Sequence, residues 1–250
     1  VPYIANLMGL SLDQVVLIAE YCGGGFGSKG SGYVQWAIPA LLARKTGRPV
    51  MLRVSRAEEF YYGKGRPGFQ LRARIGFRKD GRITAMDLFI VQDNGAYEGF
   101  PDAENALAAA SLVYQPLAMR ARAIRVFTNT PPRSPQRGPG ENQIAMALEP
   151  LIDQAAKALG IDRVEIRRIN APGHDARFGA ARTPVTSSYF REALAKGAEM
   201  FQWDKQVKLS GQRNGSKVTG VGVGTAYHSA GSSGFDGLVV IRPDGKLYVH

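Results

Sequence analysis

Cysteine is nearly absent from this sequence, with Cys22 as the single example in 250 residues. One thiol excludes both an intrachain disulfide and a metal site built from several cysteine thiolates. We expect Cys22 to be a small buried side chain beside a glycine-rich loop. The compartment stays open on this evidence, with a reducing one favoured, so we expect the cytoplasm, with the periplasm as the alternative.

Long hydrophobic runs are also missing. No apolar stretch approaches the ~18 residues that a membrane-spanning helix requires, so we expect no membrane span. The opening VPYIANLMGL has neither an initial methionine nor a basic segment before an apolar stretch, unlike a signal peptide. Because the sequence begins abruptly and stops inside a predicted strand, we expect a fragment of a longer chain or a split subunit.

The chain is basic, with 32 lysines and arginines against 21 acidic residues and a net charge of +11, but it has no continuous basic run. Arg72, Arg74 and Arg78 alternate along one predicted strand. Nucleic-acid-binding segments usually gather basic residues among aromatic ones, so we expect no nucleic-acid partner. A solvated face, or a docking surface for an acidic partner or an anionic cofactor, fits the scattered charge better.

Periodicity and turn signals predict a mixture of helices and strands. Two alternating runs, 69–77 and 82–91, flank Asp80-Gly81, which predicts a β-hairpin in a half-exposed antiparallel sheet. Further strands are predicted at 13–21, 49–55, 123–130 and in the glycine-rich region after residue 217. Helices are predicted at 31–47, 101–113, 143–159, 162–170 and 188–204. The mixture favours an α+β (mixed α/β) fold over a regular doubly wound sheet.

The segment YCGGGFGSKG, residues 21–30, is the densest glycine cluster. Its residues 25–30 match the G-x-G-x-x-G pattern of dinucleotide-binding loops, between a predicted strand and a predicted helix. That pattern also requires an acidic residue about 20 positions later, and ALLARKTGRPV supplies none. A nicotinamide-dinucleotide site therefore stays an alternative, beside a tight turn without any ligand.

A second loop suited to a ligand is QRGPGENQ, residues 136–143, directly before a predicted helix. Its glycines allow close approach, and Arg137 supplies a fixed cation with five hydrogen-bond donors. The helix start offers free backbone N–H groups to an anion. An exposed loop without a ligand is the alternative.

Four segments occur in a characteristic order: the GGGFG-x-K loop at 23–29, DNGAY at 93–97, TNTPPRSPQRGPG at 128–140 and ALEPLIDQAAKALGIDRVEIRRIN at 147–170. Together they resemble the large, molybdenum-cofactor-binding subunit of the xanthine dehydrogenase and aldehyde oxidase family of molybdenum hydroxylases. The resemblance covers essentially the whole chain. It implies a first cofactor-binding domain at 1–170, a linker at 171–186 without periodicity, and the start of a second such domain at 187–250.

The resemblance also implies the site. The cofactor is molybdopterin, expected in its cytosine dinucleotide form, and its sulfurs hold molybdenum, so no protein metal ligand is expected. The Phe26 N–H would reach an oxygen ligand of the metal, and Pro139 and Gly30 would lie in the substrate pocket. The implied cofactor-binding residues are Gly24, Gly25, Phe26, Gly27, Arg137 and Gly138.

Family members hydroxylate an electron-poor carbon of an aldehyde or an N-heterocyclic or aromatic substrate, with water as the oxygen source. Electrons leave through [2Fe-2S] clusters and FAD on partner subunits or domains. The expected partners are the rest of the molybdenum subunit, an iron–sulfur subunit, an FAD subunit and a small-molecule substrate. A non-catalytic module of the same fold, without cofactor, is a further alternative.

The match is incomplete in two respects. The family's catalytic glutamate would lie downstream, so we expect no catalytic residue within this segment. We interpret the helical glutamates Glu149, Glu165 and Glu192 as structural or surface residues. Purine-oxidising members carry phenylalanine where Pro139 stands and glutamate where Gly30 stands, which argues against xanthine as the substrate. Tyr97, Phe100 and His228 are left as either pocket or packing residues.

Overall fold

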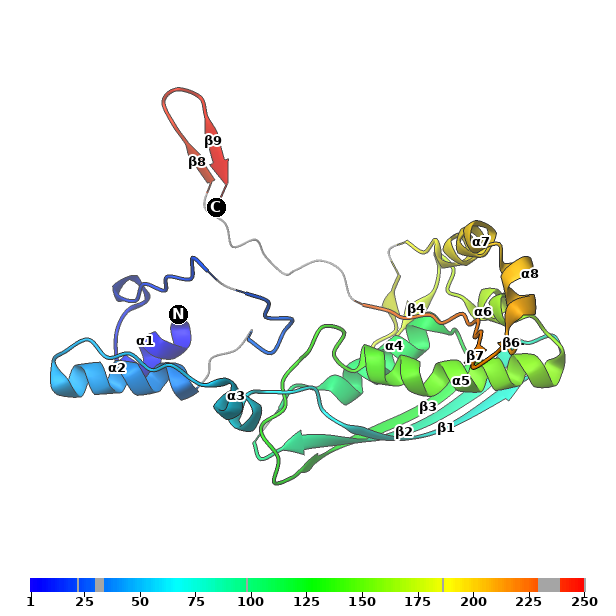
Figure 1. Ribbon diagram of the computed structural model, residues 1–250, viewed down its shortest axis with the longest axis horizontal. Helices are drawn as coiled ribbons and strands as arrows, with labels where there is room; N and C mark the ends of the chain where they lie inside the picture. The colour runs from blue at the N-terminus through cyan, green and yellow to red at the C-terminus, as the bar shows by residue number, and fades with distance from the viewer. Residues whose placement is uncertain (22, 30–33, 98, 186, 229–238, 250) are drawn as a thin grey trace.

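The computed structural model describes residues 1–21, 23–29, 34–97, 99–185, 187–228 and 239–249. Helices and strands are mixed along the chain (Figure 1), which confirms the α+β prediction. Cys22 and Gly30 lie outside the described residues. No helix in the described part is both long and apolar enough to cross a membrane.

The largest sheet among the described residues has three strands, in the order β1 (Phe69–Phe77), β2 (Ile83–Gly95) and β3 (Ala118–Phe127). Strands β1 and β2 form the predicted antiparallel hairpin, with Gly81 at a φ of 84° in the turn. Strand β3 pairs with β2 in parallel, contrary to the expected all-antiparallel sheet. The parallel pairing arises because α4 (Asp102–Val113) carries the chain back along the sheet before β3 begins.

The core lies between one face of this sheet and two helices, α4 and α5 (Glu141–Leu159). Strand β2 buries alternate side chains, including Met86, Leu88 and Ile90, as expected for a strand with one covered face. Small side chains on α4 allow close packing, and α5 adds larger aliphatic ones. The buried helix residues are Ala103, Ala106, Ala109, Ala110, Ile144, Leu148 and Ile152.

Helix α6 (Arg163–Asn170) joins the end of α5 to the sheet. Asp162 caps it as predicted, accepting hydrogen bonds from the Val164 and Glu165 N–H groups at 2.7 and 3.1 Å. At its other end the Asn170 side chain accepts from the Ile83 N–H at 2.8 Å and donates to the Gly81 carbonyl at 2.8 Å. The hairpin turn is thereby fixed to the helix.

Arg167 of α6 is fully buried and ion-paired to two acids of α5, with Nη2 at 2.7 Å from Glu149 and 2.8 Å from Asp153. Glu149 is thus a structural residue, as interpreted from the sequence. Glu165 pairs with Arg168 on the surface at 2.8 Å, and Glu192 is exposed on α7 (Phe190–Phe201).

The rest of the C-terminal region contains short elements. The predicted linker 171–186 holds a two-stranded hairpin of β4 (Arg177–Phe178) and β5 (Thr183–Pro184). After α7 come α8 (Trp203–Gln206), η2 (Val207–Leu209), β6 (Arg213–Asn214) and β7 (Lys217–Val218). The hairpin of β8 (Val239–Ile241) and β9 (Leu247–Val249) lies away from the sheet (Figure 1).

The N-terminal region lies beside the sheet-and-helix body and contains α1 (Pro2–Met8), η1 (Leu12–Gln14), α2 (Val34–Thr46) and α3 (Arg56–Tyr62). Helix α2 continues through Pro39. The strand predictions at 13–21 and 49–55 are wrong, since neither segment forms a strand in the described part. β-Branched composition favours an extended backbone, but a strand also needs a neighbouring strand to pair with. Val16 and Ile18 are instead 81% and 76% exposed.

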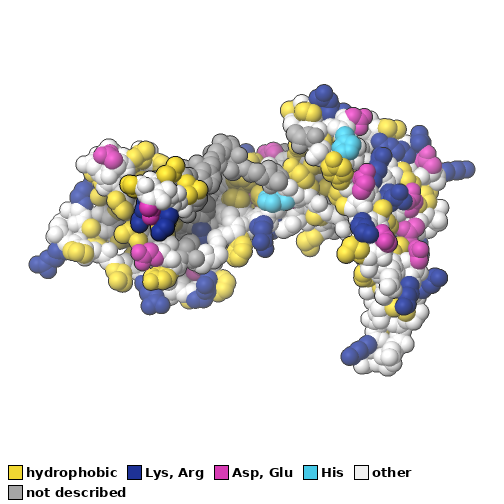
Figure 2. Space-filling model, turned by 90° about the horizontal axis from the view of Figure 1, so that it is seen from above, with side chains coloured by type: hydrophobic (Ala, Val, Ile, Leu, Met, Phe, Trp, Pro, Cys, Tyr) yellow, Lys and Arg dark blue, Asp and Glu magenta, His cyan; other side chains and the backbone are white. Residues whose placement is uncertain are grey.

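Charged and apolar side chains share the surface of the molecule. Figure 2 shows lysines and arginines, and also apolar side chains, over both parts of the visible face. The exposed apolar residues of the N-terminal region include Leu17, Tyr21, Met51, Phe60 and Tyr61. The core described above draws no residue from this region.

Candidate functional site

The two glycine-containing loops, 23–29 and 131–140, lie against each other although they are far apart in the sequence. The Arg137 N–H donates a hydrogen bond to the Phe26 carbonyl at 2.5 Å. A Cβ placed on Gly27 would lie 2.8 Å from the Pro135 carbonyl oxygen, and Gly27 has a φ of 107°. Only glycine suits both the backbone conformation and the close approach. The pair of loops forms one structural unit, called here the loop junction.

Phe26 occupies the exposed side of the loop junction. Its φ is 53°, in the left-handed region that phenylalanine seldom adopts, and its side chain is 60% exposed. The Arg137 guanidinium lies over its ring, 5.2 Å from the ring centre, a cation–π distance. Among the described residues, no hydrogen bond leads from the Phe26 N–H. The junction therefore presents an aromatic ring and a cation on the same exposed surface.

Arg66 holds the second loop, residues 131–140, through hydrogen bonds to its backbone. Its guanidinium donates to the Gly138 carbonyl at 2.8 Å, to the Arg137 carbonyl at 2.7 Å and to the Gln143 side chain at 3.1 Å. Gln143 in turn donates to the Pro67 carbonyl at 3.2 Å. With both carbonyls engaged by one planar side chain, the loop that carries Arg137 is held in a single conformation.

Asp102 is buried directly behind this loop, at the start of α4. Neither of its carboxylate oxygens has a hydrogen-bond partner of ordinary geometry among the described residues, and its exposure is 0%. Burial raises the pKa of Asp102 to about 7, and the nearby charge of Arg66 opposes the rise. Gly140, with a φ of 79°, has no room for a Cβ against the Asp102 carbonyl.

A second support connects the DNGAY segment to the TNTPPR segment. Arg133 donates to the Asp93 carboxylate at 3.1 Å, and the Thr128 and Thr130 hydroxyls donate to it as well. Burial acts to raise the pKa of Asp93, but the hydrogen bonds from Thr128 and Arg133 lower it below its usual range. A Cβ on Gly95 would lie 2.5 Å from the Pro131 carbonyl oxygen. Asp93 and Gly95 thus fix residues 128–133, where the second loop starts.

Glu141, the first residue of α5, contacts a residue of a separate cleft. Glu141 is buried and lies 2.7 Å from the His228 ring, between carboxylate oxygen and Nδ1. Burial and the Glu141 charge raise the pKa of the neighbouring Tyr227. Tyr227 and His228 line a cleft with residues of 172–190. Of the three residues left as either pocket or packing residues, His228 lines this cleft, whereas Tyr97 and Phe100 do not and are 71% and 36% exposed.

Comparison with known protein families identifies the family of this chain. The molybdopterin cofactor-binding domain family matches residues 2–171. The chain belongs to this family. It is 30% identical over 230 residues to a xanthine dehydrogenase molybdenum-binding subunit of Escherichia coli O157:H7, and 31% identical over 257 residues to an aldehyde oxidoreductase of Megalodesulfovibrio gigas.

These comparisons cover most of this chain but only part of each relative. They span 89% and 99% of this chain, and 31% and 28% of the two relatives. Among solved structures, the aldehyde oxidoreductase of Desulfovibrio desulfuricans superposes with a TM-score of 0.86 at 25% identity, over 98% of this chain and 28% of that one. Quinoline 2-oxidoreductase of Pseudomonas putida superposes with a TM-score of 0.67 at 29% identity, over 74% of this chain and 25% of that one.

The loop junction is chemically suited to the anionic cofactor of this family. Gly24, Phe26, Gly27 and Arg137 are all exposed there, whereas Gly25 is half-buried and Gly138 is buried. The Arg137 guanidinium could therefore meet an anionic group at the surface. In the described part, no three His, Cys, Asp or Glu side chains gather as metal ligands would.

Sequence reasoning placed six residues at this site, and the structure brings their two segments into contact. Pro139 is half-buried in the same loop as Arg137, while Gly30 lies outside the described residues. The supporting residues Arg66, Asp102 and Gln143 were missed. Arg66 follows Gly65 in a segment without helix or strand periodicity, so only its three-dimensional contacts reveal its place.

Proposed function

We propose that this chain forms part of the molybdopterin site of a molybdenum hydroxylase. The single observation that carries the proposal is the loop junction, in which the Arg137 N–H bonds to the Phe26 carbonyl and the Arg137 guanidinium lies over the exposed Phe26 ring. Gly24, Gly25, Phe26 and Gly27 would hold the cofactor from one loop, and Arg137 and Gly138 from the other. When bound, the cofactor supplies the metal centre that accepts electrons from the substrate.

The chain's own residues bind and orient in this scheme. Arg137 would neutralise an anionic group of the cofactor, and Arg66 would keep Arg137 in place through the backbone carbonyls of the loop. The exposed backbone of the first loop would donate hydrogen bonds without steric hindrance from neighbouring side chains. The base of the reaction would come from outside this segment.

The substrate class proposed for the whole enzyme is an aldehyde or an N-heterocyclic or aromatic compound, with water as the oxygen source. Pro139 supplies no aromatic ring for stacking on a purine, which supports a substrate other than xanthine. Iron–sulfur and FAD subunits or domains would take the electrons, and the cofactor would carry a cytosine dinucleotide. The cytoplasm stays the predicted compartment, with the periplasm as the alternative.

The decisive experiment is elemental and nucleotide analysis of the complete protein, purified from its native source with the chains that accompany it. We expect molybdenum and iron in fixed ratio to the protein, and cytidine monophosphate after acid hydrolysis. Folded protein without molybdenum would instead identify a non-catalytic module of the same fold. Bound nicotinamide would instead support the dinucleotide-binding alternative. That alternative requires a strand directly before the first loop, and the described residues 15–21 form no strand.

A further inference from the structure

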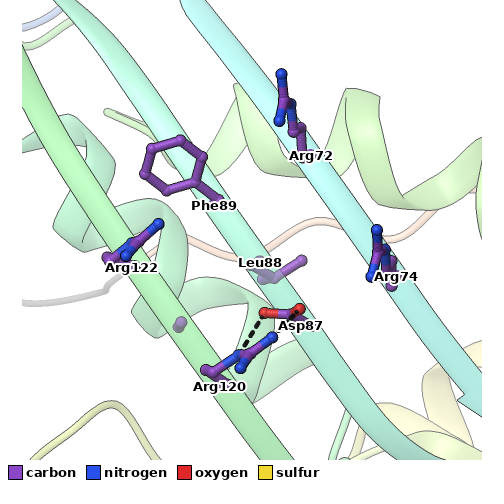
Figure 3. A pocket seen from close by; sticks show the side chains of 8 residues that line it. Arg72, Arg74, Asp87, Leu88, Phe89, Arg120 and Arg122 are labelled. Carbon is purple, nitrogen blue, oxygen red and sulfur yellow. Dashed lines mark hydrogen bonds and ion pairs between the residues drawn. The ribbon is translucent and has the colours of Figure 1, made fainter.

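The outward face of the three-stranded sheet carries two cross-strand rows of side chains. In one row Arg72 of β1, Phe89 of β2 and Arg122 of β3 lie side by side. In the next row Arg74, Asp87 and Arg120 do the same. Figure 3 shows these side chains standing on one side of the three strands, around a shallow cleft. These six residues are called here the arginine face.

The arginine face has more positive charge than its own acid can neutralise. Asp87 accepts two hydrogen bonds from Arg120, at 2.9 and 2.6 Å. Those hydrogen bonds lower the pKa of Asp87, with smaller contributions from the charges of Arg74 and Arg122. Among the described residues, Arg72, Arg74 and Arg122 form no ion pair. A strong positive field therefore lies on the side of the sheet opposite the core.

Apolar side chains accompany the charge. The Arg122 guanidinium lies over the Phe89 ring at 4.7 Å. The following cross-strand row contains Val91 and Ile124, and Ile124 is 45% exposed. A phosphate backbone makes little use of aliphatic side chains, whereas a polypeptide surface that combines acidic and apolar residues matches both kinds of contact. The Asp87–Arg120 pair already shows this face holding a carboxylate with two hydrogen bonds.

The spacing of the arginines also suits an extended polypeptide. Arg72 and Arg74 are two residues apart on one strand, as are Arg120 and Arg122 on the other. Carboxylates at alternate positions of an extended segment recur at the same interval, about 6.6 Å. Two acidic side chains of one such segment could therefore reach both arginine rows at once.

We propose that the arginine face docks an acidic, partly apolar segment of a separate protein chain, namely another subunit of the assembly to which this protein belongs. A relative of this chain is itself named as a molybdenum-binding subunit. The complementarity of charge, aliphatic contact and strand spacing identifies the segment by its chemistry. The proposal concerns assembly, so it stands apart from the loop junction and its cofactor.

The test uses the complete protein assembled with its native partner chains. Arg72→Glu combined with Arg122→Glu reverses two unpaired charges, and Arg213→Glu combined with Lys217→Glu makes the same change on the exposed β6–β7 hairpin. Partner affinity is measured by analytical ultracentrifugation at several salt concentrations, and molybdenum content reports intact folding. Arg72→Gln combined with Arg122→Gln provides a milder variant if charge reversal impairs folding.

We expect the arginine-face variants to weaken partner binding by about tenfold or more, which corresponds to about 1.4 kcal/mol, with the molybdenum content unchanged. The β6–β7 variants should bind the partner as the unmodified protein does. Equal partner affinity in both sets of variants would overturn the proposal. An oligothymidylate that binds the unmodified protein and is lost from the arginine-face variants, with the partner retained, would assign the face to nucleic acid instead.

Discussion

At the scale of single residues, the loop junction depends on positions where the backbone leaves no room for a side chain. Gly27 combines a positive φ with a carbonyl oxygen of the other loop 2.8 Å from any added Cβ. Phe26 also has a positive φ. Replacing Phe26 with proline, the simplest way to remove its N–H, would force the φ to about −65° and disturb the loop itself. Gly27 is therefore the cleaner position to test.

We predict that Gly27→Ala in the complete enzyme lowers the molybdenum content and the turnover together, because the new methyl group pushes the two loops apart. The matched control is Gly47→Ala. Gly47 has a φ of 63°, but a Cβ there would meet nothing within 4 Å, so it reports the backbone strain alone, about 1–2 kcal/mol. Metal analysis and thermal unfolding of both variants separate the two effects. Equal molybdenum contents in the two variants would contradict a cofactor role for the junction.

Asp102 makes the free energy of unfolding depend on pH. Its folded-state pKa of about 7 lies above the ordinary value of 3.8, so the folded state holds a proton that the unfolded state has lost at intermediate pH. The stability that this group contributes is complete below about pH 4 and is lost as the pH rises towards 7 and beyond. The total change is roughly 4 kcal/mol, at about 1.4 kcal/mol per pKa unit.

We predict that Asp102→Asn removes this dependence, since the amide has no proton to lose. The free energy of unfolding of the variant, minus that of the unmodified protein, should increase between pH 4 and pH 7 and then level off. Chemical denaturation across the pH range measures the difference directly. A difference that stays constant from pH 4 to pH 8 would show that Asp102 is not buried as a neutral acid.

Some single-residue roles could be predicted from sequence and others could not. Asp162 as a helix cap was predicted correctly, because a cap bonds to residues two and three positions away. Arg66 contacts carbonyls more than 70 positions away, and no local pattern encodes that distance. The same reason hides Asp102, whose burial depends on the packing of α4 against the second loop.

At the scale of elements, local signals predicted the longer helices and the β1–β2 hairpin, but neither the short helices α1 and α3 nor the pairing of β3. Gly160 ends α5 and Asp80-Gly81 turns the β1–β2 hairpin, as predicted. The parallel partner of β2 was not foreseen, because a parallel strand can pair only after a long crossover. The segments 13–21 and 49–55 have strand-like composition, yet they find no partner strand in the described part of the chain.

The joint between α5 and α6 offers a test with adjacent residues. Arg167 is fully buried and pairs with Glu149 and Asp153, whereas Arg168 is exposed and pairs with Glu165. We predict that Arg167→Met destabilises the protein by about 3–5 kcal/mol. Glu149 would lose its counter-charge, and Asp153 would keep only the 3.7 Å pair with Arg163. Arg168→Met should lower the free energy of unfolding by less than about 1 kcal/mol.

Denaturant unfolding of the two variants, side by side, measures both values. Circular dichroism before denaturation confirms that each variant starts from the same fold. Similar losses of stability at the two positions would show that the buried pairs contribute no more than surface ones, and that α6 is held mainly by its apolar contacts.

At the scale of the whole molecule, the apolar core and the apolar surface belong to different regions. The core cluster draws only on residues from the sheet, its covering helices and their immediate neighbours. The N-terminal 62 residues instead expose many large apolar side chains, such as Tyr21 at 98% and Met51 at 89%. Apolar surface of this extent is uncommon on a free monomer.

We predict that limited proteolysis of the isolated chain cuts first within residues 1–62 and leaves a resistant fragment that contains β1 to α6. Mass spectrometry of the fragments identifies the cut sites. In the complete enzyme the same region should be protected, because its apolar side chains then have partners. Early cleavage within β1–β3, with 1–62 intact, would contradict this division of the molecule.

The hydrogen bond from Arg137 to Phe26 closes a chain segment of more than a hundred residues. The contacts of Gly65 with Arg133 and Ser134 already close much of this segment, so the junction adds the further cost of closing residues 26–65. We therefore expect this contact to form late in folding, after the sheet and its helices, and to open readily when the cofactor is absent. Maturation of the protein would then have a built-in order: the body folds first, an open gap between the two loops admits the cofactor, and cofactor insertion itself completes the final step of folding.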